Sequence, residues 1–424
     1  MKPFAKLLII ALFFLSACSG GKPELVFSVG GAPHELDFWE ELIADFESKT
    51  NIKVRIVRQP IDTDQRRQSI LIPLKAKIKN PDIFLMDIAW IPQFSASNWL
   101  ENLQPHMKQD NYDLGHFWAN MLKSADTYKG NLIALPVFID AGVFYYRKDL
   151  LKKYGFKGPP KYWDELLKMS DKIQKGERKN NPKFFAFVWQ GAQYEGLICD
   201  FLEFASLEGG GFQIGENGVE VDNDANRQAA DLMNNLIHKY KVSPPNTFTD
   251  MKEEQVRRYF QSGNALFERN WPYAWGLHQK TDSPVEGKIG IAPIPAFRGG
   301  KSFSTLGGWH VGISKYSDKK KEAWAFAKYM VSKDVQKQIA LRLGFNPSRK
   351  DLYSDKDILA EYPHFKSLAK VFENAKARPS IPYYTPVSDV LQRHINSIVA
   401  DKVESSSALK EAEKEIIAIV ERYK

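Results

Sequence analysis

The spacing of apolar and polar residues over the first ninety positions predicts alternating strands and helices. Strands are expected at Glu24–Val29, Ile52–Val57 and Asp82–Asp87, where Ile, Val and Phe dominate or alternate with polar residues. Apolar residues at helical spacing predict helices over His34–Ser48 and over Asp64–Lys79, the second interrupted or shifted near a proline. This β-α-β-α-β order predicts a mainly parallel sheet flanked by helices.

The rest of the chain continues the alternation without an internal repeat or a low-complexity linker. Short strands are expected at Leu132–Leu135, Ala141–Tyr146, Ala265–Glu268, Lys288–Ala292 and Val311–Ser314, with residues 136–140 as a connection. Helices are expected at Trp163–Gln174, Glu195–Leu207, Ala225–Tyr240, Glu253–Ser262, Lys319–Val331, Asp334–Arg342, Ser388–Ala400 and Ser406–Tyr423. A chain of 424 residues exceeds one typical core, so we expect two α/β lobes with a ligand cleft between them.

The first eighteen residues have the features of an export signal. Two lysines precede an apolar run from Leu7 to Leu15, too short to span a bilayer. The tetrad that ends in Cys18 resembles the bacterial lipobox; an ordinary signal peptide is the alternative. We expect residues 1–17 to be a signal peptide and residues 18–21 a lipidated tether, so that the protein works outside the cytoplasm, anchored to the cell membrane.

Composition excludes several classes of function. The net charge is +8, but the basic residues are scattered, which argues against nucleic-acid binding. The eight histidines lack metal-ligand spacing and no phosphate-binding Gly-Lys-Ser/Thr loop is present, so no metal and no cofactor is expected. Once Cys18 is acylated, Cys199 has no partner, and its apolar surroundings predict a buried, inert thiol.

Asp87 is the first candidate for a ligand site. It follows the expected strand Asp82–Asp87 directly and precedes a polar-aromatic turn. Ligands of open parallel sheets bind beyond the carboxyl ends of the strands, which is where this residue lies. A helix N-cap is the alternative role.

Aromatic residues beside proline and glycine form two further candidate segments. Trp271 and Tyr273 flank Pro272, and the stretch from Gly307 to Trp309 precedes a strand. Aromatic rings near carboxylates suit sugars, whose rings have apolar faces and polar rims. A core cluster is the alternative for Trp271, and a tight turn beside a core tryptophan for the glycine segment. Arg378 lies in a Pro-aromatic loop and offers five fixed donors.

These residues belong to longer motifs that resemble a known family. The motifs are 29–35 (VGGAPHE), 84–90 (FLMDIAW), 136–142 (PVFIDAG), 145–150 (YYRKDL), 267–275 (FERNWPYAW), 306–309 (LGGW), 378–379 (RP) and 382–384 (PYY). The resemblance that they carry extends over almost the whole mature chain. The chain resembles the extracellular solute-binding lipoproteins of ATP-driven sugar importers, the maltose-binding-protein-like family, and within it most of all the trehalose/maltose-binding proteins.

The resemblance implies a sugar site with acceptors, aromatic walls and donors. Glu35, Asp87 and Asp140 would accept hydrogen bonds from hydroxyl groups. Trp271, Tyr273 and Trp309 would form the aromatic walls. Arg66 and Arg378 would donate hydrogen bonds, and Gly308 would contact the sugar through its backbone. Phe138 also belongs to this site, in a position where the family leads us to expect tyrosine. Ile61 stands where threonine is expected. Each departure removes a hydroxyl group and can change which sugar is preferred.

The resemblance also implies a two-lobed periplasmic-binding-protein fold with a discontinuous chain. Residues 22–138 and 307–343 would form the N-terminal lobe, and residues 139–306 and 344–424 the C-terminal lobe. The implied function is a high-affinity, monomeric, non-enzymatic receptor. It would capture a di- or oligosaccharide by lobe closure and deliver it to the permease subunits of an ABC importer, with ATPase subunits on the cytoplasmic side. A glycoside hydrolase and a receptor for a non-sugar solute are the alternatives.

Overall fold

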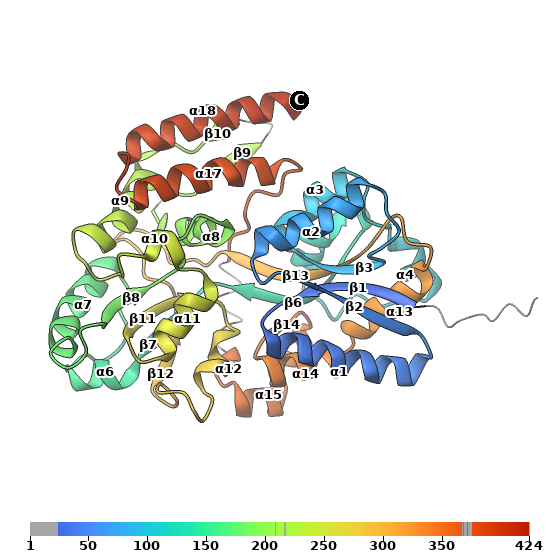
Figure 1. Cartoon of the computed structure of the whole chain (residues 1–424), viewed down its shortest axis with the longest axis horizontal. Coiled ribbons are helices and arrows are strands. Elements are labelled where there is room, and N and C mark those ends of the chain that lie inside the picture. The colour runs from blue at the N-terminus through green and yellow to red at the C-terminus, as the bar shows by residue number, and fades with distance from the viewer. Residues whose placement is uncertain are drawn as a thin grey trace, which may run out of the picture.

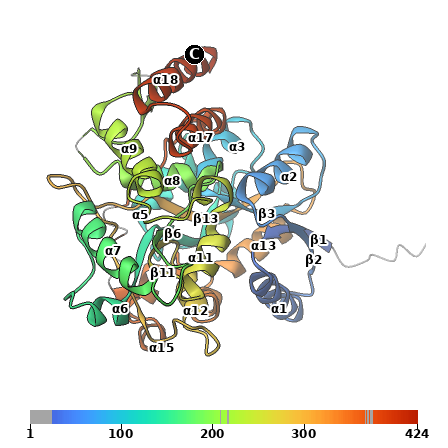
Figure 2. The same cartoon turned by 60° about the vertical axis from the view of Figure 1, so that its left-hand side comes forward.

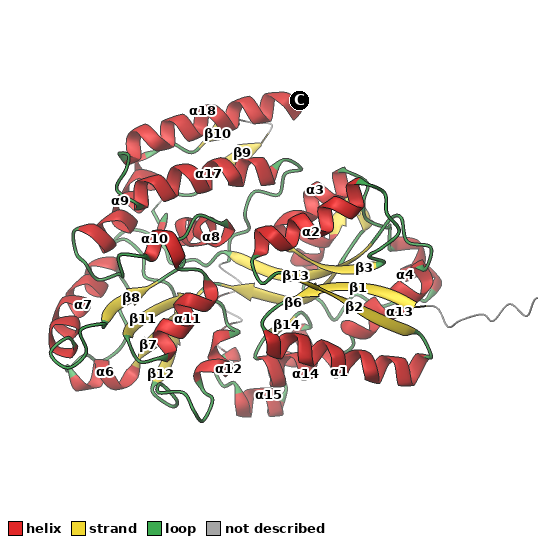
Figure 3. Ribbon diagram, in the orientation of Figure 1, coloured by secondary structure: helices red, strands yellow, loops and turns green. Residues whose placement is uncertain are grey.

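The molecule consists of two lobes that lie side by side, each built on a β-sheet (Figure 1). The structure is a computed structural model and describes residues 24–423, apart from 208, 216–217, 367, 369–370 and 372–374. Helices flank both sheets (Figure 3). The predicted two-lobed α/β fold is thus confirmed, whereas the expected signal peptide and Cys18 lie outside the described residues.

The first lobe contains a six-stranded sheet. Its strands lie in the order β14 (Asn346–Pro347), β6 (Leu135–Ala141), β13 (Leu306–Ile313), β3 (Ile83–Asp87), β1 (Glu24–Gly30), β2 (Lys53–Gln59). The helical segments near it are α1 (Pro33–Thr50), α2 (Thr63–Lys75), η1 (Ile88–Trp90), α3 (Ile91–Ala96), α4 (Gln104–Gln109), α5 (Ala119–Met121), η2 (Leu122–Asp126), α13 (Lys320–Met330), α14 (Lys333–Gln338) and η3 (Ile339–Leu343). A small hairpin pairs β4 (Thr127–Tyr128) with β5 (Asn131–Leu132).

The second lobe contains a four-stranded sheet. Its strands lie in the order β12 (Ile289–Ala292), β7 (Val143–Arg147), β11 (Ala265–Asn270), β8 (Phe185–Val188). The helical segments of this lobe are α6 (Lys148–Lys153), α7 (Trp163–Glu177), α8 (Glu195–Phe204), α9 (Asp224–His238), α10 (Thr247–Asp250), α11 (Glu253–Gln261), α12 (Ala274–His278), η4 (Lys350–Ser354), α15 (Lys356–Glu361), α17 (Tyr384–Val399) and α18 (Ser405–Tyr423). A small hairpin pairs β9 (Gln213–Gly215) with β10 (Gly218–Glu220). Helices α17 and α18 pack against each other at the edge of this lobe (Figures 1 and 2).

The prediction of mainly parallel sheets needs correction, because both sheets are mixed. β1 pairs in parallel with β2 and β3, but β13 runs antiparallel between β3 and β6. In the second sheet β7 runs antiparallel to both β11 and β12. The reversed strands enter from the other lobe, β7 directly after β6 and β13 after β12. A helical crossover makes consecutive strands of one sheet parallel. These two strands are not reached by such a crossover within their own sheet, so they can run antiparallel to their neighbours.

The segment 136–140, expected as a connection, belongs to strand β6. Proline lacks the N–H group that a strand interior uses, which is why Pro136 argues against a strand. In the structure Pro136 pairs with His310 where the register of β13 shifts, and a proline is tolerated at such a bulge. Strand β6 ends at Ala141 and β7 begins at Val143, so the chain passes between the two sheets at Gly142. The predicted lobe boundaries stay a prediction.

Helix α1 illustrates how the apolar pattern builds the first lobe. Phe38, Trp39, Leu42, Ile43 and Phe46 are buried, as the helical spacing predicts. The helix begins with a proline at its first turn and ends at a residue in the left-handed conformation, both common at those positions. Among the described residues no helix combines the length and apolar character that crossing a bilayer requires.

Phe326 belongs to the hydrophobic core that packs against the first sheet. Its ring is fully buried, with ring centroids 5.3 Å from Phe27 and 4.9 Å from Phe46. We expect Phe326→Ala to lower the free energy of unfolding by about 3–5 kcal/mol, because it removes buried surface and leaves a cavity. Urea unfolding measures this. Ile72→Ala, at a side chain that is 63% exposed, serves as the control, and an equal effect of both substitutions would contradict the packing described.

Candidate ligand-binding site

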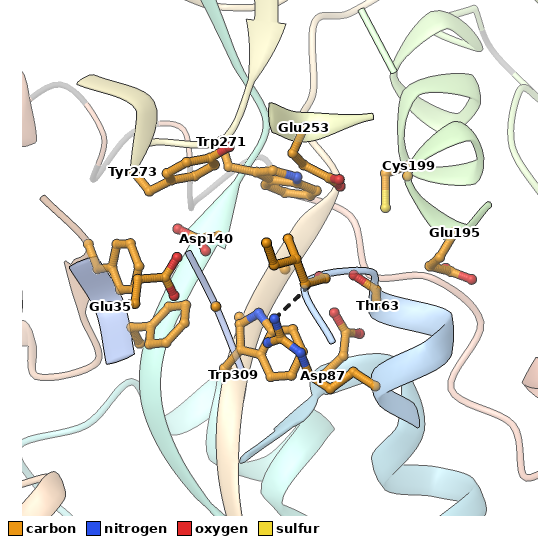
Figure 4. Close-up of a pocket in the computed structure, with 18 of the residues that line it drawn as sticks. Glu35, Thr63, Asp87, Asp140, Glu195, Cys199, Glu253, Trp271, Tyr273 and Trp309 are labelled. Atoms are coloured by element: carbon orange, nitrogen blue, oxygen red, sulfur yellow. Dashed lines mark hydrogen bonds between the residues drawn. The ribbon is translucent and has the colours of Figure 1, made fainter. Parts of the chain in front are cut away.

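A cavity between the lobes collects every site residue predicted from the sequence. Counting the space at its mouth that is open to solvent, its empty volume is about 870 Å³. Trp271 and Tyr273 line one side, and Trp309 and Asp87 the other (Figure 4). The predicted residues at the cavity are Glu35, Arg66, Asp87, Phe138, Asp140, Trp271, Tyr273, Gly308, Trp309 and Arg378.

Arg378 connects two carboxylates at one end of the cavity. Its guanidinium donates to Asp87 Oδ1 at 2.9 Å and to Glu195 Oε1 at 3.0 Å. Glu195 accepts further hydrogen bonds from the hydroxyls of Tyr384 at 2.6 Å and Ser388 at 2.5 Å. Burial alone would lower the pKa of Arg378, but the carboxylates raise it well above its usual range, so the guanidinium stays charged.

Asp87 combines the two roles that the sequence left open. Its Oδ1 accepts the backbone N–H of Ala89 at 2.8 Å, which makes it the N-cap of η1. The same carboxylate pairs with Arg378 and lines the cavity. The cap fixes this carboxylate at the end of strand β3, so it reaches the cavity in a defined orientation.

Two further carboxylates, the half-buried Glu35 and the buried Asp140, face the opposite end of the cavity. Glu35 Oε1 accepts the backbone N–H of Ala32 at 3.0 Å and so caps the start of α1. Burial raises the pKa of Glu35 to about 7. Burial also raises the pKa of Asp140 well above its ordinary range, and the nearby charge of Glu35 adds to this shift. A ligand that donates hydrogen bonds to these carboxylates would stabilise their charged forms.

Trp271 and Tyr273 are held in place by polar contacts on their own lobe. The hydroxyl of Tyr145 donates to the carbonyl oxygen of Trp271 at 2.9 Å and to that of Pro272 at 3.2 Å. The hydroxyl of Tyr273 donates to Glu254 Oε1 at 2.8 Å. Trp271 is half-buried and lines the cavity, so it is not a fully buried core tryptophan.

Trp309 forms the wall on the first lobe together with Arg66. The guanidinium carbon of Arg66 lies 4.2 Å from the centroid of the Trp309 ring. Arg66 also donates to the carbonyl oxygens of Pro60 at 3.2 Å and Ile61 at 3.3 Å. Trp90 meets Trp309 edge to face, with ring centroids 5.3 Å apart. These contacts hold Trp309 in place, and the N–H groups of Arg66 bring hydrogen-bond donors to this wall of the cavity.

The two glycines before Trp309, Gly307 and Gly308, allow close packing against the neighbouring strand and against the Trp271 ring. Gly308 has a φ of +138°, and a Cβ atom there would lie 2.7 Å from the carbonyl oxygen of Phe138. A Cβ atom on Gly307 would lie 3.1 Å from the Trp271 ring. Glycine at 307 therefore lets a tryptophan of the second lobe approach a strand of the first lobe closely.

The sequence analysis missed several residues of the cavity. Glu195 and Glu253 are the first residues of α8 and α11, where an acidic residue is common for its effect on the helix dipole. Because this role already explains an acidic residue at a helix start, the sequence pattern carries no separate signal that Glu195 and Glu253 line the cavity. Cys199 lies one turn after Glu195 and is 2% exposed, as predicted for a buried thiol, and burial raises its pKa well above the usual range. The other lining residues not predicted are Gly31, Ala32, Thr63, Gly196, Glu254 and Phe345, whereas Ile61 and Gly307, both singled out in the sequence, also line the cavity.

Comparison with known proteins identifies the family. Residues 32–337 match the family described as bacterial extracellular solute-binding protein. A protein of Deinococcus radiodurans described as a probable ABC transporter-binding protein is 38% identical over 423 residues, 99% of each chain. The chain belongs to the bacterial extracellular solute-binding proteins. The predicted membership of the solute-binding family is thereby confirmed, and so is the exclusion of an enzyme, because members of this family are substrate-binding receptors of ABC transporters.

Solved structures agree with this assignment. Maltose-bound T. maritima MalE3 has a TM-score of 0.88 and 38% sequence identity, covering 93% of this chain and 99% of that one. A solute-binding protein of Thermotoga lettingae bound with α-D-tagatose has a TM-score of 0.84 and 26% identity, covering 94% and 100%. The fold of this solute-binding protein is therefore the two-lobed fold of the maltose-binding proteins. Such receptors work with permease and ATPase subunits.

The raised pKa of Glu35 makes a testable prediction for the ligand-free protein. Its pKa rises from 4.5 to about 7, so the native state holds a proton that the unfolded chain releases between these pH values. Ionisation of Glu35 therefore lowers native stability as the pH rises through this window, and the loss is complete above pH 7. Glutamine keeps the shape of the side chain but cannot ionise.

We therefore expect Glu35→Gln to become more stable relative to the unchanged protein by up to about 3 kcal/mol between pH 4 and pH 8. Urea unfolding of both proteins without ligand at the two pH values measures this change. An equal difference in unfolding free energy at both pH values would show that Glu35 is not destabilised by its burial.

Proposed function

We propose that this protein is the receptor for a di- or oligosaccharide of the trehalose or maltose type. It captures the sugar between its lobes and delivers it unaltered to a membrane permease. The observation that carries the proposal is the pairing of Trp271 and Trp309 on opposite sides of one cavity, with charged acceptors and donors between them. Sugar rings have apolar C–H faces that suit aromatic rings, and hydroxyl rims that suit carboxylates and guanidinium groups.

The groups around the cavity favour a neutral, polyhydroxylated ligand. Glu35 and Asp140 are acceptors without an ion-pair partner among the described residues, and each accepts at most one hydrogen bond from the protein. A hydrogen bond to a charged group contributes about 1.5–3 kcal/mol, so hydroxyl donors from a sugar would be bound strongly. In their charged forms the same carboxylates would repel phosphate esters and other anions.

Contacts across the cavity support capture by lobe closure. Lys252, just before α11 of the second lobe, forms an ion pair with Asp62, the N-cap of α2 in the first lobe. Arg378 reaches Asp87 at the end of β3 from a loop before α17. These contacts hold the lobes together around the cavity, as expected for the closed form of a hinged receptor.

Two structural neighbours and two apolar residues of the cavity bear on the type of sugar. The neighbour that is 38% identical binds maltose, and the one that is 26% identical binds tagatose, a monosaccharide. Phe138, whose ring centroid lies 4.5 Å from that of Phe345, presents no hydroxyl at one end of the cavity. Ile61, which also lines the cavity and is 56% exposed, presents none either. A site with these apolar residues would favour a sugar that does not require donors there.

Calorimetric titration with maltose, maltotriose, trehalose and tagatose tests the proposal. We expect tight binding of at least one di- or oligosaccharide, and chromatography of the recovered ligand should show it intact. Absence of heat with every sugar would contradict the proposal, and a released monosaccharide would favour the glycoside hydrolase alternative. Heat with an amino acid or a phosphate ester instead would favour a receptor for a non-sugar solute.

Replacement of Trp271 tests the stacking surface directly. We expect Trp271→Ala to weaken binding of the preferred sugar by about 30-fold or more, because a central aromatic contact is lost. Tyr240→Ala is the matched control, since Tyr240 is an aromatic residue of the same lobe, 41% exposed and outside the cavity. An unchanged dissociation constant in Trp271→Ala would remove this residue from the site.

We also infer from the sequence that Cys18 carries a lipid anchor and that the receptor acts as a monomer. Acyl chains on the mature N-terminus would hold it at the membrane while the lobes stay in water. We expect Cys18→Ser to release the protein from membranes into the soluble extracytoplasmic fraction. Equal membrane retention of the variant would contradict lipidation, and mass spectrometry of the unchanged protein provides the direct check.

A further inference from the structure

A buried ion pair lies behind the Trp271 ring. Arg269 donates through Nε and Nη2 to the two carboxylate oxygens of Glu203, both at 2.6 Å. Its guanidinium carbon lies 4.2 Å from the centroid of the Trp271 ring. Arg269 is 1% exposed and does not line the cavity, whereas Trp271 does. The guanidinium therefore supports the ring on the side turned away from a ligand.

The same ion pair touches both chain segments that join the two sheets. Thr305, just before β13, donates its backbone N–H to Glu203 Oε1 at 2.9 Å. Gly142, between β6 and β7, lies so close that a Cβ atom there would be 2.0 Å from Glu203 Oε1 and 2.4 Å from Arg269 Nη2. Only the absence of a side chain at position 142 lets the ion pair occupy this place.

The two joining segments also bond to each other. Gly142 donates its N–H to the carbonyl oxygen of Thr305 at 3.4 Å, and the hydroxyl of Ser304 donates to the carbonyl oxygen of Gly142 at 2.6 Å. The hydroxyl of Thr305 donates to the carbonyl oxygen of Cys199, in the same helix as Glu203, at 2.8 Å. The segments thus form one unit that rests on α8 and on the ion pair.

We propose that the Arg269–Glu203 pair couples the angle between the lobes to the orientation of Trp271. Arg269 and Glu203 act as positioning residues, since neither lines the cavity. Gly142 and Thr305 lie on the two segments that pass from one sheet to the other, where a change of lobe angle would act, and both are in direct contact with the Glu203 carboxylate. The proposal rests on the proposed function in one respect, that Trp271 contacts the ligand.

The coupling follows from the rigidity of a buried, bidentate ion pair. Separating such charges in a site without water is costly, so the pair moves as a unit instead of breaking. Arg269 has little freedom of its own, because Asp200 lies 2.9 Å from Nε and Gln190 accepts from Nη1 at 3.3 Å. A displacement at the joining segments is therefore passed on to the ring that stacks on the guanidinium.

Fluorine NMR of protein labelled with 5-fluorotryptophan tests this coupling without any ligand. Trp271→Phe identifies the resonance of Trp271, and the other nine tryptophans serve as internal references. We expect Gly142→Ala, which displaces the ion pair by contact, to shift or broaden the Trp271 resonance. Glu203→Gln, which removes one charge but keeps the shape, should do the same. It also carries the test if Gly142→Ala does not fold.

Asp222→Asn is the matched control. It removes another bidentate ion pair of the same lobe, in which Arg227 donates to the two carboxylate oxygens of Asp222 at 2.8 and 2.9 Å. This pair contacts neither the joining segments nor the cavity. A general loss of stability would move many resonances in all three variants. A Trp271 resonance unchanged in the folded Glu203→Gln protein would overturn the coupling.

Calorimetry with the sugar preferred by the unchanged protein gives a second readout. We expect Glu203→Gln to weaken binding by about 2- to 30-fold, the usual size of an indirect coupling effect, and Asp222→Asn to leave it unchanged. Equal affinity of Glu203→Gln and the unchanged protein would contradict the proposal. If the unchanged protein binds no sugar, the proposed function fails, and the ligand-free NMR experiment still decides the coupling.

Discussion

The site depends on a single buried guanidinium that joins distant parts of the chain. Arg378 is 291 positions from Asp87 and 183 from Glu195, yet it bonds to both. Removing one partner of a buried ion pair typically costs about 3–5 kcal/mol, because the other charge is left without compensation. This cluster therefore holds the end of strand β3, the start of helix α8 and the loop before α17 in one place. The cavity owes its shape at this end to those three elements.

The distribution of charge explains what such a cavity can hold. At the Arg378 end the guanidinium forms ion pairs with the carboxylates, whereas no cation among the described residues forms an ion pair with Glu35 or Asp140, which face the cavity. Those two carboxylates gain most from a ligand that brings several neutral donors at once. Trp271, supported from behind by Arg269, supplies the apolar surface that such a ligand also needs. A polyhydroxylated ring meets both demands, and an anion meets neither.

The sequence predicted much of this arrangement, and its failures have physical causes. Asp87 could be placed because a strand end is visible in the apolar pattern. The pairing of β13 with β3 and β6 could not be predicted, because β13 arrives from the other lobe and its partners leave no local signal in the sequence. Glu195 was missed because an acidic residue at a helix start has an ordinary explanation. The role of Gly142 depends on an ion pair formed between α8 and β11, which only the folded chain brings together.

The central claim is that both lobes close on one intact sugar within this cavity. A crystal structure of the protein grown with saturating maltose or trehalose tests it most directly. The account predicts an undegraded sugar that contacts Trp271 from the second lobe and Asp87 or Trp309 from the first. A sugar bound on one lobe alone, or a cavity left empty while sugar binds elsewhere, would contradict it.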